Sequence, residues 1–129
     1  MEKRKILVVD DEIDFLQLLK ARLEANNYNV VTAGNGKEAL EKFKKEKPDA
    51  LMLDIMMPGI DGLSVLKTIR KEDEKIPIFI ITAFSNEERF KVANQFNVSG
   101  FIMKTSELQA EIDNITTSIE IAAKHKNKK

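Results

Sequence analysis

Residues 50–59 read ALMLDIMMPG, and this stretch decides the fold of the chain. A short uncharged apolar run ends in one carboxylate, Asp54, and Pro58 and Gly59 follow closely. Such a run is typical of a strand that is buried on both faces inside a parallel sheet. A carboxylate does not belong in that interior. We therefore expect Asp54 at the carboxyl end of the strand, in the crevice where open α/β sheets bind their ligands.

The composition restricts the class of protein and of site. The chain has 129 residues, 43% of them hydrophobic, which suits one domain with a sizeable core. Its net charge is zero, so bulk charge indicates no polyanionic partner. It has no cysteine, and its one histidine, His125, lies in a polar tail, so neither a thiol nucleophile nor a histidine metal site is expected. No apolar run approaches the roughly 20 residues of a membrane span, and we recognise no signal peptide, so we expect a cytoplasmic protein.

Apolar runs alternate with helical patterns along the chain. We expect strands at residues 6–9, 28–33, 50–54, 78–82 and 98–103. We expect helices at about residues 12–25, 35–47, 61–71, 85–96 and 106–123. This alternation predicts an α/β fold in which a five-stranded parallel sheet is doubly wound by five helices through right-handed crossovers. We see no repeat and no linker, and expect one domain over residues 1–123 with a basic tail at 124–129.

Two helices carry patterns that can be checked. The first helix should bury an apolar face formed by Ile13, Leu16, Leu19, Ala21 and Leu23. Asn26 and Asn27 should end it. The second helix should begin with a capping box, in which Asn35 and Glu38 exchange hydrogen bonds.

Polar residues follow four of the expected strands. Asp10 and Asp11 come after the first, Asp54 ends the third, Thr82 ends the fourth and Lys104 follows the fifth. In a doubly wound sheet these ends open on one edge, so the side chains should converge. Carboxylates packed together repel one another, and a hard divalent cation such as Mg²⁺ relieves that repulsion with the oxygen ligands it prefers.

The same edge offers groups that bind a phosphate. The Lys104 ammonium can pair with a phosphate oxygen, and the Thr82 hydroxyl can donate to another. An anion site built around a carboxylate indicates phosphoryl transfer to that carboxylate, because aspartate forms aspartyl-phosphates. The metal and the lysine would neutralise charge on the transferring group.

These residues resemble the receiver domain of two-component response regulators, in the single-domain form of the chemotaxis regulators. The resemblance covers essentially the whole chain and rests on five residues in order: the adjacent Asp10 and Asp11, Asp54 within LDIMMPG, Thr82 followed by alanine, and Lys104 at the end of a strand. It implies a flavodoxin-like sheet of order 2-1-3-4-5. It also implies a phosphorylation-dependent signalling switch, and not an enzyme that acts on a metabolite.

The resemblance assigns a role to each site residue. Asp54 would accept the phosphoryl group from a sensor histidine kinase or phosphotransfer protein. Asp11, Asp54 and the backbone carbonyl of Met56 would hold Mg²⁺, with help from Asp10. Lys104 would pair with the phosphoryl group.

The resemblance also implies how the signal is read. Thr82 would move toward the phosphoryl group, and Phe101 would rotate inward as the switch aromatic. The face made by the fourth helix, the fifth strand and the fifth helix would then change its affinity for an output partner, with no direct contact to nucleic acid or membrane.

The sequence departs from the family pattern in two places. Thr105 follows Lys104 where the family usually has proline, so we expect a trans bond there. Met56 and Phe84 occupy positions beside the phosphoryl site that are often polar in the family. Apolar side chains there should exclude the attacking water and prolong the life of the aspartyl-phosphate.

Other interpretations stay open. Asp10 and Asp11 are also good helix caps, and Phe101 is also an ordinary core residue. An aspartyl-phosphate phosphatase of the haloacid dehalogenase type also uses Asp, Thr and Lys, although its nucleophile lies in a D-x-D pattern after the first strand, which is absent here. A receiver-like interaction module that is never phosphorylated is the third possibility.

Overall fold

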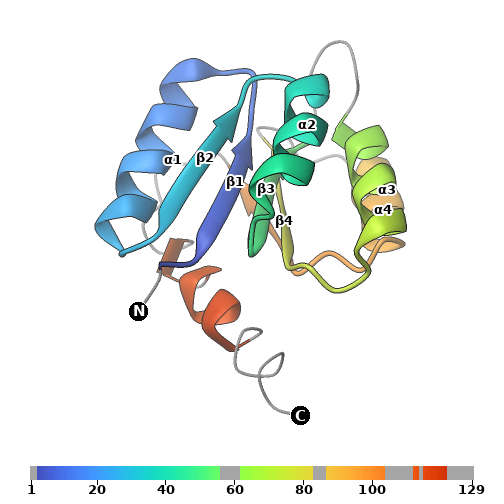
Figure 1. Cartoon of the computed structure of the whole chain (residues 1–129). Helices are drawn as coiled ribbons and strands as arrows, with labels where there is room; N and C mark the ends of the chain where they lie inside the picture. Colours follow the sequence, from blue (N-terminus) through green and yellow to red (C-terminus); the bar gives the residue numbers. More distant parts are fainter. Residues whose placement is uncertain (1–2, 56–61, 83–86, 104–111, 114, 122–129) are drawn as a thin grey trace.

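A single parallel sheet forms the centre of the computed structural model, which describes residues 3–55, 62–82, 87–103, 112–113 and 115–121. The strands are β1 (Lys5–Val9), β2 (Asn29–Ala33), β3 (Ala50–Asp54), β4 (Ile78–Thr82) and β5 (Gly100–Met103). Their order is β2-β1-β3-β4-β5, and every neighbouring pair is parallel (Figure 1). The sequence-based fold class and the strand order are therefore confirmed.

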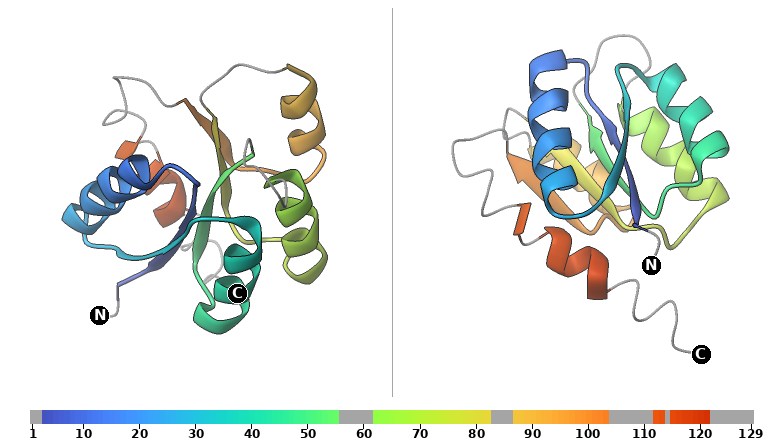
Figure 2. Two further views of the ribbon diagram at one scale, coloured as in Figure 1. Left: turned by 90° about the horizontal axis from the view of Figure 1, so that it is seen from above. Right: turned by 60° about the vertical axis from the view of Figure 1, so that its left-hand side comes forward.

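Helices cover both faces of this sheet. They are α1 (Ile13–Ala25), α2 (Gly36–Glu46), α3 (Gly62–Glu72) and α4 (Glu87–Asn94). Residues 112–113 and 115–121 are also helical and are called the last helix below. The view from above shows α1 and the last helix on one face, and α2, α3 and α4 on the other (Figure 2).

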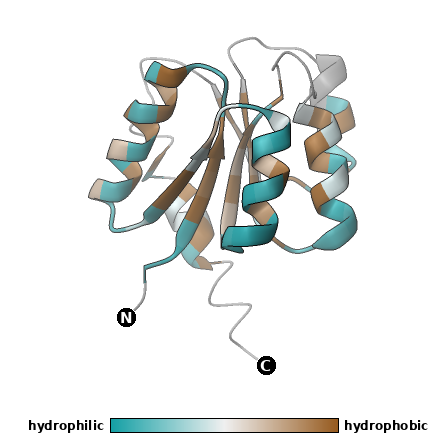
Figure 3. Ribbon diagram, turned by 45° about the horizontal axis from the view of Figure 1, so that its top comes forward, coloured by the Kyte–Doolittle hydropathy of each residue, from teal (hydrophilic) through white to brown (hydrophobic). Residues whose placement is uncertain are grey.

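The two faces explain why the strand sequences are apolar without alternation. Along β1, Ile6 and Val8 pack under α1 and the last helix, while Leu7 and Val9 pack under the other three helices. All four side chains are fully buried. In Figure 3 the central strands are coloured mainly as hydrophobic, and the helices beside them carry both hydrophilic and hydrophobic residues. A strand buried on both sides must be apolar at every position.

The buried face of α1 differs from the predicted one. Leu16, Leu19 and Leu23 are buried as expected, but Ile13 is 67% exposed and Ala21 is exposed. Spacings of three and four place residues 16, 19 and 23 on one side of a helix, whereas residue 21 falls near the opposite side. Ile13 lies at the first turn, at the edge of the sheet. The predicted helix end is confirmed, because Asn26 is the C-cap of α1.

The capping of α2 is confirmed in part. The Asn35 side chain accepts a hydrogen bond from the Glu38 backbone N–H at 2.9 Å, as predicted. The returning bond runs from the Gly34 N–H, not from Asn35, to the Glu38 carboxylate at 3.5 Å. A hydrogen bond from the Lys42 side chain lowers the pKa of Glu38.

Helix α4 and strand β5 are both shorter than predicted. The helix ends at Asn94 and not at residue 96, and the strand begins at Gly100 and not at residue 98. Asn97 between them has a φ of 57°. This left-handed turn reverses the chain and explains both boundaries, because neither helix nor strand continues through it.

The left-handed conformation of Lys47, the C-cap of α2, gives a first prediction. Its φ of 49° and ψ of 61° favour glycine. Lys47→Gly should raise the free energy of unfolding by about 0.5–1 kcal/mol, because the strain of a Cβ in this region exceeds the extra freedom of glycine in the unfolded chain. Lys45→Gly, an exposed position inside α2, should instead lower it by about 1 kcal/mol. Urea unfolding measures both, and equal losses in the two variants would contradict the account.

Candidate functional site

The direction in which successive strands are added to the sheet reverses between β1 and β3. The chain winds outward from β1 to β2 on one side and from β3 to β5 on the other, and open α/β sheets have their crevice at such a point, between the carboxyl ends of β1 and β3. Val9, the last residue of β1, pairs with Leu53. Asp10 and Asp54 are the next residues on these neighbouring strands, and the topology alone brings them together.

Three carboxylates meet in this crevice. Oxygens of Asp10, Asp11 and Asp54 all lie within 4.8 Å of one another. Asp10 is fully buried, Asp54 is 2% exposed and Asp11 is exposed. The predicted convergence of the acids is therefore observed, and Asp11 forms the side of the cluster that is open to solvent.

The backbone holds Asp10 in place on two sides. Its N–H donates to the carbonyl of Ala33 at 3.1 Å, which extends the pairing of β1 with β2. Its side chain accepts a hydrogen bond from the Glu12 N–H at 2.9 Å. The N-cap of α1 is Glu12 itself, so capping of this helix does not account for the Asp10-Asp11 pair.

The donor set of the cluster suits a hard divalent cation. Two buried carboxylates beside a third carry a large desolvation and repulsion cost unless positive charge balances them. All three offer oxygen atoms, which Mg²⁺ prefers over nitrogen or sulfur. Asp11 leaves an exposed side where Mg²⁺ could keep water ligands. The residues present therefore fit the predicted magnesium site.

Gly62 is a residue that sequence reasoning missed. It begins α3, and a Cβ at this position would lie 2.1 Å from the carbonyl oxygen of Asp54 and 2.5 Å from the Cα of Ile55. Only glycine lets the helix lie directly on the backbone that carries the phosphoacceptor candidate. The signal was a glycine inside a predicted helix, which costs about 1 kcal/mol relative to alanine and so calls for a packing reason.

The structure describes the other predicted site residues only in part. Thr82 is the last residue of β4, and the pairing of Asp54 with Ile81 puts its backbone at the same edge of the sheet. Phe101 lies on β5, is half-buried, and packs against the core under α3 and α4. Its switch role stays a prediction. Lys104, with the bond to Thr105, and Met56 and Phe84 lie outside the described residues.

Comparison with known proteins decides the family. The family model described as response regulator receiver domain matches residues 6–116. The chain belongs to this family. Receiver domains bind Mg²⁺ at a cluster of aspartates, and the three carboxylates of this receiver domain occupy such a cluster. The resemblance drawn from the strand-end residues is confirmed.

The sequence relatives are longer than this chain. The regulatory protein PhoP of alkaline phosphatase synthesis from Bacillus subtilis is 38% identical over 123 residues, which are 93% of this chain and 51% of PhoP. A probable transcriptional regulator, ycf27 of Porphyridium aerugineum, is 36% identical over 98% of this chain and 54% of its own length. The chain thus spans about half the length of the curated relatives that it matches.

Solved receivers share the whole fold. TrrA of Thermotoga maritima, in complex with Mg(2+)-BeF, is 36% identical, with a TM-score of 0.80 over 89% of this chain and 98% of that one. Chemotaxis protein CheY4 of Vibrio cholerae is 26% identical, with a TM-score of 0.84 over 91% of this chain and 99% of that one.

Substitution of Gly62 tests how the crevice is built. Gly62→Ala should lower Mg²⁺ affinity about 10–100-fold, because the added methyl displaces the backbone that positions Asp54. It should also cost about 1–3 kcal/mol of stability through overpacking. Ser64→Ala, at an exposed position of α3, should change stability by less than about 0.5 kcal/mol and leave Mg²⁺ affinity unaltered. Calorimetric Mg²⁺ titration measures the affinity, and a Gly62→Ala protein that binds Mg²⁺ like the wild type would contradict the account.

Proposed function

We propose that this receiver domain is a phosphorylation-dependent signalling switch whose phosphoacceptor is Asp54. The observation that carries the proposal is the nearly buried Asp54 carboxylate, grouped within 4.8 Å with Asp10 and Asp11 at the edge where the sheet reverses. Such a carboxylate is a nucleophile, and its acidic neighbours can hold the Mg²⁺ that neutralises charge on a transferred phosphoryl group. The matching TrrA structure contains Mg(2+)-BeF, and the RstA receiver of Klebsiella pneumoniae, 28% identical, is described as BeF3-activated.

The site residues take separate roles in this proposal. Asp10, Asp11, Asp54 and the backbone carbonyl of Met56 would hold Mg²⁺, which supplies charge neutralisation for the transferring group. Lys104 would pair with a phosphoryl oxygen, and Thr82 would donate to another. The buried position of Asp54 limits access to the crevice from solvent, so the donor must approach past the exposed Asp11.

The transfer itself needs only one nucleophile from this chain. A carboxylate oxygen of Asp54 attacks the phosphorus of a phosphohistidine on a sensor kinase or phosphotransfer protein. A P–O bond forms as the P–N bond breaks, and the electron pair of that bond stays on the imidazole nitrogen, which takes up a proton. In hydrolysis, water replaces the aspartate oxygen on phosphorus and restores the carboxylate.

The response would be read on the side of the sheet beyond Asp54. Thr82 and Phe101 lie on β4 and β5, the two strands next to β3 on that side. A change in their positions would alter the face of α4, β5 and the last helix, and with it the affinity for an output partner. The protein would assist its own phosphorylation and hydrolysis, with no metabolite as substrate.

The wider setting is also part of the proposal. Residues 1–123 would form the receiver domain and residues 124–129 a basic tail. No described helix has the length and apolar character needed to cross a membrane. The predicted cytoplasmic location and the absence of direct nucleic-acid contact remain predictions.

Mass measurement after incubation with a small phosphodonor and Mg²⁺ tests the phosphoacceptor. The wild-type chain should gain the mass of one phosphoryl group, and Asp54→Ala should gain none. Asp14→Ala, which removes an exposed carboxylate from α1, should behave like the wild type. Labelling of Asp54→Ala would refute the assignment. Turnover of a phosphomonoester would favour the phosphatase, and failure to bind Mg²⁺ with beryllofluoride would favour a module that is never phosphorylated.

The lifetime of the phosphorylated form tests the role of Met56 and Phe84. Replacing both by asparagine should speed loss of the phosphoryl group, because polar side chains can orient the attacking water. Decay of the phosphorylated mass with time measures this rate. Equal lifetimes in wild type and double variant would contradict the shielding role.

A further inference from the structure

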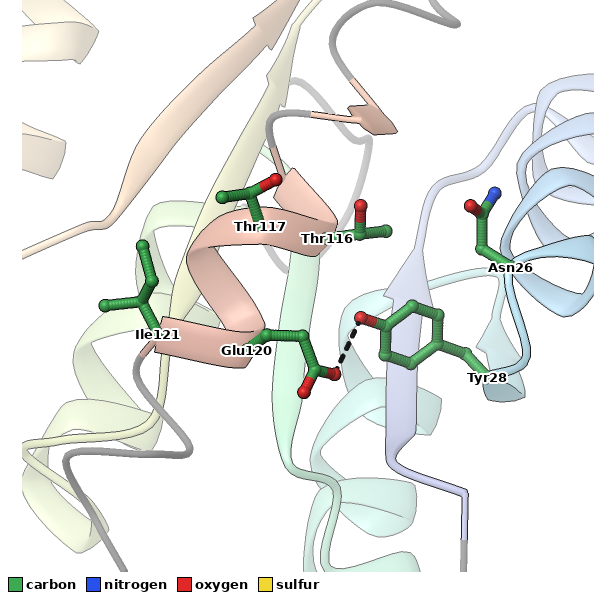
Figure 4. Close-up of a pocket in the computed structure, with 6 residues that line it drawn as sticks. All are labelled: Asn26, Tyr28, Thr116, Thr117, Glu120 and Ile121. Carbon is green, nitrogen blue, oxygen red and sulfur yellow. Dashed lines mark hydrogen bonds between the residues drawn. The ribbon is translucent and has the colours of Figure 1, made fainter. Parts of the chain in front are cut away.

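A hollow of about 450 Å³ lies at the amino edge of the sheet, opposite the acidic crevice. It is lined by Asn26, Tyr28, Thr116, Thr117, Glu120 and Ile121 (Figure 4). Two of these residues connect α1 to β2, and four belong to the last helix. The hollow is therefore the joint between the last helix and the segment that connects α1 to β2.

The polar groups of this hollow already have partners within the chain. The Asn26 amide donates to the Arg22 carbonyl at 2.8 Å. The hydroxyls of Thr116 and Thr117 donate to the Asp113 carbonyl at 2.9 and 3.0 Å. Donors engaged in this way offer little to a small-molecule ligand, so the hollow is better explained as a structural joint than as a binding site.

One carboxylate connects three segments that are far apart in the sequence. The Tyr28 hydroxyl donates to Glu120 at 3.1 Å, drawn as the dashed line in Figure 4. The Arg4 Nε donates to both Glu120 oxygens, at 3.1 and 3.3 Å. Glu120 thus ties the last helix to the residues that directly precede β1 and β2.

The apolar side of the last helix adds to this tie. Ile112, Ile115 and Ile119 are buried in the core under α1, together with the ring of Tyr28, which is 5% exposed. The Arg4–Glu120 ion pair is partly exposed, and such pairs are weak alone. The ring of Tyr28 is fixed in the core, and its hydroxyl holds the Glu120 carboxylate in one position by a hydrogen bond. The Arg4–Glu120 ion pair therefore contributes more to stability than it would alone.

We propose that Arg4, Tyr28 and Glu120 form a latch that fastens the last helix to β1 and β2, so that this helix keeps its place when the acidic crevice changes charge. The contacts described above support the fastening of the last helix. The claim that this helix keeps its position during phosphorylation rests on the proposed function. The change in partner affinity then comes from α4 and β5, and the last helix is the fixed reference beside them.

The titration of Tyr28 supports the closed latch. Burial, and next the nearby Glu120 carboxylate, raise the pKa of the phenol from its ordinary 10.0 to about 12, while Arg4 opposes the shift. The folded state favours the protonated phenol, so this contribution to stability is complete below pH 10 and is lost as the pH rises through about 12. Tyr28 is the single tyrosine and the chain has no tryptophan, so tyrosine absorbance and emission report on this joint alone.

Hydrogen exchange of the full chain tests the fastening. Amides of residues 117–121 should lose about fivefold in protection in Tyr28→Phe, and about tenfold in Glu120→Ala, which removes both bonds. Alanine favours helix more than glutamate does, so helix propensity cannot explain a loss in Glu120→Ala. Thr117 lines the same hollow, and the Thr117→Ala variant should keep wild-type protection of these amides. Unchanged protection in Glu120→Ala would overturn the latch.

Tyrosine spectroscopy tests whether the helix stays in place. In Glu120→Ala, the alkaline midpoint of Tyr28 should fall below about 12, although burial of the phenol still raises it, and the tyrosine emission should change. Saturating Mg²⁺ and beryllofluoride should leave the wild-type emission as it is. If binding of Mg²⁺ and beryllofluoride changes the wild-type tyrosine emission as the Glu120→Ala substitution does, the latch opens. That result would overturn the claim that the last helix keeps its place. If beryllofluoride does not bind, the proposed function fails, and hydrogen exchange still decides the latch.

Discussion

The carboxylates of Asp10 and Asp54 lie at the ends of adjacent strands with almost no contact to solvent, and the rest of the molecule is arranged around this pair. Such a pair is unfavourable by itself, because desolvation and repulsion both oppose it. It persists because β1 and β3 are buried on both faces and cannot slide without exposing apolar side chains. A bound cation would balance that charge, and in the proposed function the same cation would neutralise the charge of the incoming phosphoryl group.

The two edges of the sheet differ in what they hold in place. At the carboxyl edge, only the small size of Gly62 allows α3 to lie on the Asp54 backbone, so this edge is tightly packed yet chemically open at Asp11. At the amino edge, Tyr28 and Glu120 join segments 92 positions apart. The proposed switch would need both properties, a site whose charge can change and a part of the fold that keeps its position.

Sequence patterns predicted the features that depend on local periodicity and on the residues at strand ends. The strands and their parallel pairing follow from apolar runs that alternate with helical patterns, and the meeting of Asp10, Asp11 and Asp54 follows from their positions at strand ends. Contacts made across the chain were not predictable in this way. Gly62 was missed because its neighbour is the backbone of another element, and Glu120 because its partners, Arg4 and Tyr28, lie far from it in the sequence. Ile13 was misplaced because periodicity does not show where a helix leaves the edge of a sheet.

A crystal structure of the chain with Mn²⁺ in place of Mg²⁺ and with beryllofluoride, with the metal located by anomalous scattering, tests the central claim most directly. The account predicts one metal ion bound by oxygens of Asp11 and Asp54 near Asp10, and beryllofluoride on the Asp54 carboxylate. A metal bound elsewhere, or beryllofluoride on another residue, would contradict it.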